Sequence, residues 1–102
     1  MDIFVAGGGA VGRHLARLLC GEGHNVVIIE SNPAEIEGLE YSLDARTVLG
    51  DAASVMLLQA EGIGGADLFV AATGSDEVNL IAAAAAKGLG AKQVVARADG
   101  AM

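Results

Sequence analysis

Three glycines near the start of the chain have the spacing G-x-G-x-x-G: Gly7, Gly9 and Gly12, in the stretch VAGGGAVG. In this spacing the first glycine permits a tight turn, the second lets backbone amides approach a pyrophosphate, and the third lets a helix pack closely on the preceding strand. The free N–H groups at the start of that helix then point at the phosphates. The motif predicts a phosphate-binding turn, although a glycine-rich turn that holds no ligand can have the same letters.

An acidic residue stands at the distance from this motif that ribose recognition requires. Glu30 ends the apolar stretch NVVIIE, 18 residues after Gly12, and an acid that binds ribose hydroxyls is expected roughly 20 residues beyond the glycines. A 2′-phosphate here would bring like charges together, so Glu30 favours a free 2′-hydroxyl. The two features predict NAD(H), ADP or ATP as ligand rather than NADP(H). The alternative is a solvated acid that ends a strand.

Polar residues also follow the later apolar stretches. Asp51 comes after TVLG, the segment TGSD at 73–76 follows LFVAA, and Arg97 follows QVV. Each of these is by itself compatible with a solvated loop. In a parallel sheet all of them lie at the carboxyl edge, which is where α/β proteins bind ligands.

Five short apolar runs predict strands, and longer stretches with helical spacing lie between them. The runs are continuous in apolar character, as in strands buried on both faces, and they span residues 3–6, 26–29, 47–49, 68–72 and 94–96. Helix starts are marked by Asn32 with Pro33, and by Ser75 with two acids. We therefore predict an α/β fold: a doubly wound, Rossmann-like parallel sheet in the order 3-2-1-4-5, with helices on both faces in three αβα layers.

Composition argues against several classes of protein. The chain has 102 residues, 53% of them hydrophobic, and a net charge of −7. The length fits one domain over residues 1–102, and the negative charge disfavours nucleic acid and anionic lipid headgroups as partners. No apolar run approaches the ~20 residues of a membrane span, and the first residues do not resemble a secretory signal. With Cys20 as its one cysteine, the chain is expected in the cytoplasm.

Candidates for catalysis are few. His14 lies within the first predicted helix and His24 precedes the second strand, at the sheet edge opposite the glycines, so both are interpreted as surface or packing residues. Cys20 is interpreted as a small buried residue rather than a nucleophile. Arg13 and Arg17 share a helix face and are interpreted as solvated. Since no cluster has the spacing of metal ligands, the sequence predicts neither catalytic residues nor a metal site.

Several segments together resemble one family. MDIFVAGGGAVGRHLARLL, VVIIE, LGDAAS, GADLFVAATGSDEVNLIAA and VVARA look like the nucleotide-binding domain of TrkA-type potassium-uptake regulators, the KTN or RCK N-terminal domain. The resemblance covers almost the whole chain, and GDAAS and ATGSDEVN are more specific than the glycine motif. It implies a domain that binds NAD(H) or adenine nucleotides and, in assembled rings, controls cation flux through a membrane partner.

The resemblance also implies roles for individual positions. Phosphates would be held by Gly7, Gly8, Gly9, Ala10, Val11 and Gly12, the adenosine ribose by Glu30 and Ser31, and the adenine region by Asp51 and Ala52. The rest of the nucleotide would be lined by Thr73, Gly74, Glu77 and Asn79, with Arg97 reaching toward phosphate or an acidic partner.

Two functions remain open on the sequence. The first is a non-catalytic regulatory domain, the N-terminal part of a longer regulator, whose nucleotide state changes subunit packing and gates a potassium transporter or channel. The alternative is the cofactor-binding domain of an NAD-dependent oxidoreductase that lacks its substrate domain. The family domain normally continues into a sixth strand and a crossover helix that builds the dimer, whereas this sequence stops at Met102. We therefore expect a homo-oligomer that is weaker than in a longer chain.

Overall fold

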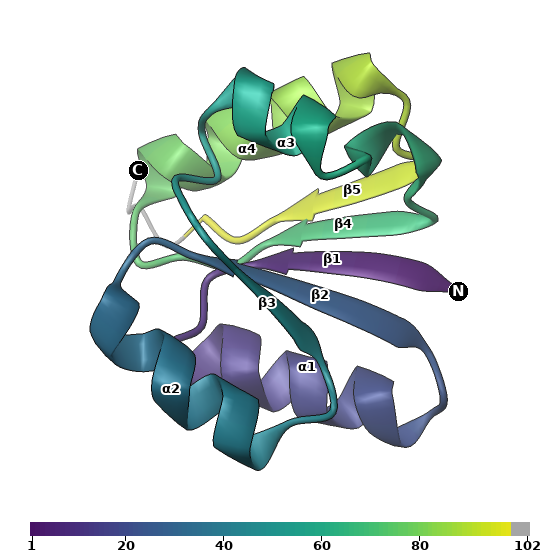
Figure 1. Ribbon diagram of the computed structural model, residues 1–102. Coiled ribbons are helices and arrows are strands. Elements are labelled where there is room, and N and C mark those ends of the chain that lie inside the picture. Colours follow the sequence, from purple (N-terminus) through teal and green to yellow (C-terminus); the bar gives the residue numbers. More distant parts are fainter. Residues whose placement is uncertain (99–102) are drawn as a thin grey trace.

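A computed structural model of the chain describes residues 1–98, so the last four residues of the predicted domain lie outside the described part. Five strands form one parallel sheet in the order β3-β2-β1-β4-β5 (Figure 1). The strands are β1 (Asp2–Ala6), β2 (Asn25–Glu30), β3 (Arg46–Leu49), β4 (Leu68–Ala71) and β5 (Gln93–Ala96). The predicted fold class and strand order are confirmed, and the strand ends differ from the expected ones by one residue at most.

Helices cover both faces of this sheet. On one face lie α1 (Ala10–Gly21) and α2 (Pro33–Ser42); on the other lie α3 (Val55–Ala60) and α4 (Asp76–Leu89) (Figure 1). A short 3-10 helix, Ile63–Gly65, leads from α3 into β4. The predicted three αβα layers are therefore present, and no helix within residues 1–98 has the length and hydropathy that crossing a bilayer requires.

The core is divided by the sheet into two apolar clusters. Phe4 and Phe69 pack under α3 and α4, while Ile3 and Ile28 pack against α1 and α2. Because β1 contributes side chains to both clusters, it is buried on both faces, as predicted. The same prediction is wrong for β3 and β5. These are the edge strands of the described sheet, and Val95 of β5 is 53% exposed.

The turn from β1 into α1 depends on two glycines. Gly7 has φ +108°, a left-handed conformation that side chains rarely adopt, and a Cβ there would meet the carbonyl oxygen of Ala72 at 2.7 Å. Gly12 packs against the carbonyl of Gly7 so closely that a Cβ has no room. The chain can therefore leave β1 and begin α1 immediately, which places the start of α1 at the carboxyl edge of the sheet.

Asn79 of α4 is a buried polar residue that joins three elements. Its side chain is fully buried, and its Oδ1 accepts hydrogen bonds from the Thr73 amide at 2.9 Å and the Thr73 hydroxyl at 2.7 Å. Its Nδ2 donates to the carbonyl oxygens of Thr73 at 3.1 Å and Arg97 at 3.0 Å. One amide thus satisfies the backbone where the chain leaves β4 and again where it leaves β5.

We predict that Asn79→Ala lowers the free energy of unfolding by about 2–4 kcal/mol, because it leaves several buried donors and acceptors without partners. Urea unfolding followed by circular dichroism measures this. Gln59→Ala removes an exposed amide from α3 and serves as the control, with an expected change below about 0.5 kcal/mol. Equal stability of the two variants would show that the buried amide contributes nothing.

Candidate functional site

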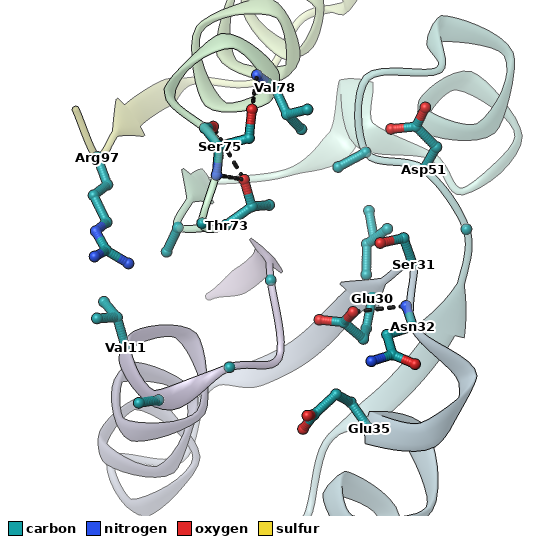
Figure 2. A pocket seen from close by; sticks show the side chains of 18 residues that line it. Val11, Glu30, Ser31, Asn32, Glu35, Asp51, Thr73, Ser75, Val78 and Arg97 are labelled. Carbon is teal, nitrogen blue, oxygen red and sulfur yellow. Dashed lines mark hydrogen bonds between the residues drawn. The ribbon is translucent and has the colours of Figure 1, made fainter. Parts of the chain in front are cut away.

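A cavity of about 480 Å³ opens at the carboxyl edge of the sheet, between the first turns of α1, α2 and α4 (Figure 2). Its position is the one expected for ligands of doubly wound sheets, where the strand order reverses between β1 and β4. Its volume falls in the range of small-molecule sites. Most of the predicted site residues line it: Gly7, Gly9, Ala10, Val11, Glu30, Ser31, Asp51, Ala52, Thr73, Gly74 and Arg97.

Four of the predicted site residues do not line this cavity. A Cβ on Gly8 would meet Leu39 at 2.5 Å, and its amide is already bonded to Glu30, so this N–H is not available to a ligand. Gly12 is buried against Gly7. Asn79 faces inward, as described above, and Glu77 lies exposed on the outer side of α4. At these four positions the structure places no side chain or free amide in the cavity wall, and their roles in nucleotide binding stay predictions.

Six other residues of the cavity wall were not assigned to the site from the sequence. They lie at or just after the ends of strands, or in the first turns of helices: Ile29, Asn32, Glu35, Gly50, Ala72 and Val78. A signal for Asn32 and Glu35 was present, because α2 begins directly after Glu30 and its first turn must lie at the same edge. Ser75, in the segment at 73–76 that was expected at this edge, also lines the cavity.

The first turn of α1 differs from those of the other helices. Side chains cap α2, α3 and α4, where Asn32, Ser54 and Ser75 each accept a backbone N–H, but α1 begins at Gly9 without a side-chain cap. A Cβ on Gly9 would meet no atom within 4 Å, and the backbone there is extended, with φ −76°. Nothing in the described protein therefore requires glycine at this position, whereas a ligand lying against the backbone would.

Glu30 projects its carboxylate into the cavity and is held there by two loops (Figure 2). Its Oε1 accepts the amide of Gly8 at 2.6 Å and its Oε2 accepts the amide of Asn32 at 2.7 Å. A carboxylate has about four lone-pair positions, so each oxygen can accept one further hydrogen bond. The arrangement presents two fixed acceptors at the end of β2, which suits a pair of neighbouring hydroxyl groups.

The opposite side of the cavity is formed by the ends of β4 and β5 (Figure 2). Thr73 accepts the amide of Ser75 at 3.2 Å and is tied to Asn79, so the loop before α4 is fixed in place. Arg97 and Val11 lie together at the end of the cavity away from Glu30. Asp51, at the end of β3, accepts the amide of Ala53 at 2.9 Å. Charge is therefore unevenly distributed, with carboxylates toward β2 and β3 and a guanidinium toward β5.

Arg13, expected to be solvated, forms an ion pair. Its Nη2 lies 3.3 Å from Oε2 of Glu35, which lines the cavity beside Glu30. The pair joins α1 to α2, two helices that lie on the same face of the sheet. The interpretation of Arg13 as a solvated residue is wrong, because spacing along one helix does not reveal contacts with another.

The candidate acid, base and thiol groups lie elsewhere. His14 is on the exposed side of α1, and His24 Nδ1 accepts a hydrogen bond from the amino group of Met1 at 3.1 Å, at the far edge of the sheet. Partial burial raises the pKa of the Cys20 thiol, and the negative charge of Asp44 adds to the rise. Within residues 1–98 no three His, Cys, Asp or Glu side chains gather closely enough to hold a metal ion.

One protein family and several known proteins have sequences similar to this chain. The TrkA-N domain family matches residues 3–102. A Trk system potassium uptake protein TrkA homolog from Archaeoglobus fulgidus is 43% identical over 99 residues, which are 97% of this chain and 22% of that protein. A homolog of the same name from Methanothermobacter thermautotrophicus is 36% identical over 97 residues, 95% of this chain and 45% of that protein.

Solved structures share the fold. The Kef CTD of Shewanella denitrificans in AMP-bound form has a TM-score of 0.77 at 26% identity, covering 93% of this chain and 57% of that chain. The GsuK channel bound to NAD has a TM-score of 0.75 at 21% identity, covering 92% of this chain and 21% of that chain, a likeness of fold alone. The chain spans less than half the length of the curated relatives it matches. Because the family match extends over nearly the whole sequence, the chain belongs to the TrkA-N domain family.

Proposed function

We propose that this chain is a nucleotide-binding regulatory domain that controls potassium uptake. The observation that carries the proposal is the start of α1: an uncapped helix N-terminus at Gly9, where a Cβ would meet nothing, opens on the same cavity as the fixed carboxylate of Glu30. Helix N-termini favour phosphates, and a carboxylate at the end of β2 favours ribose hydroxyls. The start of α1 would therefore bind the phosphates of a nucleotide, and the end of β2 would bind the ribose of the same nucleotide.

Each part of the ligand has matching residues in the cavity wall. The backbone of Gly9, Ala10 and Val11 would hold phosphates, Glu30 and Ser31 the ribose, and Asp51 and Ala52 the adenine region. The remaining part of a dinucleotide would lie toward Thr73, Gly74 and Arg97. Gly8 supports this arrangement indirectly, since its amide fixes Glu30 instead of a phosphate.

NAD(H) is the first choice of ligand, and ATP, ADP or AMP is the alternative. Both classes carry an adenosine ribose and phosphates, which is the part of the ligand that the Gly9 and Glu30 regions would recognise. Similar structures include one bound to AMP and one bound to NAD, which supports an adenine nucleotide of either kind. NADP(H) is disfavoured because its 2′-phosphate would face Glu30.

The regulatory role comes from the relatives. They are named Trk system potassium uptake proteins, and each is more than twice as long as this chain. We infer that the domain is part of such a regulator, works as a homo-oligomer, and acts from the cytoplasmic side on a membrane potassium transporter or channel. Nucleotide binding would change how its subunits pack, which is how a domain without catalytic groups can transmit a signal.

The ligand preference is tested at Glu30. We predict that NAD⁺ or AMP raises the melting temperature of the native chain, and that NADP⁺ binds roughly a hundredfold more weakly, a difference of a few kcal/mol from charge repulsion and lost hydrogen bonds. A ligand at about 100 times its dissociation constant adds roughly 2.7 kcal/mol of stability, which a thermal-shift assay detects. Glu30→Ala should weaken NAD⁺ binding and narrow the gap to NADP⁺.

Glu37→Ala is the control for the Glu30 experiment, because it removes the same charge from an exposed position of α2 outside the cavity. It should leave both affinities within about twofold of the native values. A native chain that binds neither adenine nucleotide would overturn the proposed function. A native preference for NADP⁺, or an unchanged ranking in Glu30→Ala, would remove Glu30 from the ribose site.

A second prediction distinguishes glycines that affect nucleotide binding from glycines that affect the stability of the fold. Gly9→Ala should keep the melting temperature, since its Cβ enters open space, but raise the dissociation constant for the nucleotide about tenfold by pushing the phosphates away. Gly21→Ala, also in open space but far from the cavity, should change neither the affinity nor the fold. Gly12→Ala should lower the melting temperature because its Cβ collides with Gly7. Calorimetric titration beside thermal unfolding measures both quantities, and equal affinities of Gly9→Ala and Gly21→Ala would contradict the phosphate assignment.

A third prediction concerns catalysis. We expect the chain to bind NADH without oxidising it, because none of His14, His24 and Cys20 lines the cavity. Incubation with NADH and a panel of keto acids and aldehydes, followed at the nicotinamide absorbance, measures this. Steady oxidation that depends on the protein would favour the oxidoreductase alternative over a regulatory domain.

A further inference from the structure

A second carboxylate stands beside Glu30 in the cavity wall. Glu35, in the first turn of α2, lines the cavity (Figure 2). Its carboxylate lies on the same side of the cavity as Glu30 and Asn32. Glu30 is held by two backbone amides, whereas the Oε2 of Glu35 is held by Arg13 Nη2 at 3.3 Å. Its position is therefore set by an ion pair between α1 and α2.

Arg13 lies against the facing helix at Gly38. A Cβ on Gly38 would lie 3.4 Å from Arg13 Nη2, an ordinary van der Waals distance, so the guanidinium packs closely on α2. Arg13 follows Gly12 directly and comes from the same first turns of α1 that approach the cavity. The guanidinium of Arg13 thus lies close to the ribose side of the proposed site, where it is paired with the carboxylate of Glu35.

The pair is only partly shielded from water. The side chains of Arg13 and Glu35 are 31% and 42% exposed, so the ion pair itself contributes little to stability. Its effect on a charged ligand is larger, because a guanidinium binds phosphate through two parallel hydrogen bonds when no carboxylate occupies it. Whether Arg13 is available to bind a phosphate near Glu30 therefore depends on Glu35.

We propose that Glu35 is a specificity-determining residue of the nucleotide site, which excludes a 2′-phosphate by holding Arg13 in an ion pair. Removing Glu35 releases Arg13 as a receptor for that phosphate. This inference rests on the proposed function, and it assigns the choice between 2′-hydroxyl and 2′-phosphate to two residues in addition to Glu30.

The test is a double-mutant cycle of Glu35→Ala, Arg13→Ala and the combined variant. The probes are two ligand pairs that differ by the 2′-phosphate alone, NAD⁺ with NADP⁺ and 5′-AMP with 2′,5′-ADP. In Glu35→Ala we expect the affinity for the 2′-phosphorylated member to rise about tenfold and that for its partner to stay within about twofold. Adding Arg13→Ala should abolish the gain, and the gain should shrink as salt is raised.

Glu37→Ala, on the same helix but outside the cavity, is the control for net charge. Glu35→Gln keeps the shape of the side chain and should give a smaller gain in the same direction, so a poorly folded alanine variant does not decide the matter. An equal gain in affinity for the 2′-phosphorylated ligand in Glu37→Ala, or a gain that persists without Arg13, overturns the inference. In that case NAD⁺ binding by the native chain still upholds the proposed function. A native chain that binds neither member of either pair overturns both.

Discussion

The contact between Gly12 and the carbonyl of Gly7 is the constraint on which the site depends. A side chain at either position would push α1 away from the end of β1, and the first turn of α1 would no longer face the carboxyl edge of the sheet. The order of the strands then creates the cavity, because the reversal between β1 and β4 leaves open space directly in front of that turn. The two glycines thus determine where the N-terminus of α1 lies, and the strand order of the parallel sheet leaves the cavity in front of it.

Glu30 has a structural task as well as the proposed binding task. Its carboxylate links the turn before α1, through Gly8, to the turn before α2, through Asn32. A few residues further on, Arg13 and Glu35 make a second link between the same two helices. The Glu30 side of the cavity is therefore held in place without a ligand, which reduces the entropy that would be lost in ordering it on ligand binding. Such a site is suited to sensing a ligand rather than to folding around it.

The sequence predicted the parts of this site that follow from the strands alone. Glu30, Asp51 and Arg97 were found because a residue that ends a parallel strand must lie at the carboxyl edge, whatever its surroundings. Asn79 and Glu77 belong to the same motif, but which of them faces inward depends on how α4 packs on the sheet, and the motif does not state this. The Arg13–Glu35 pair joins residues 22 apart in the chain and becomes visible only when α1 and α2 lie side by side.

The amide of Asn79 ties the cavity wall to the backbone that follows β5. Thr73 lines the cavity, and three of the bonds to Asn79 hold it, while the fourth holds the carbonyl of Arg97 beyond β5. A fully buried side chain in a close-packed interior has no slack to absorb a displacement. A displacement of Thr73 would therefore strain the hydrogen bond that Asn79 donates to the carbonyl of Arg97. One buried amide thus connects the cavity wall to the backbone beside the edge strand β5 of the described sheet.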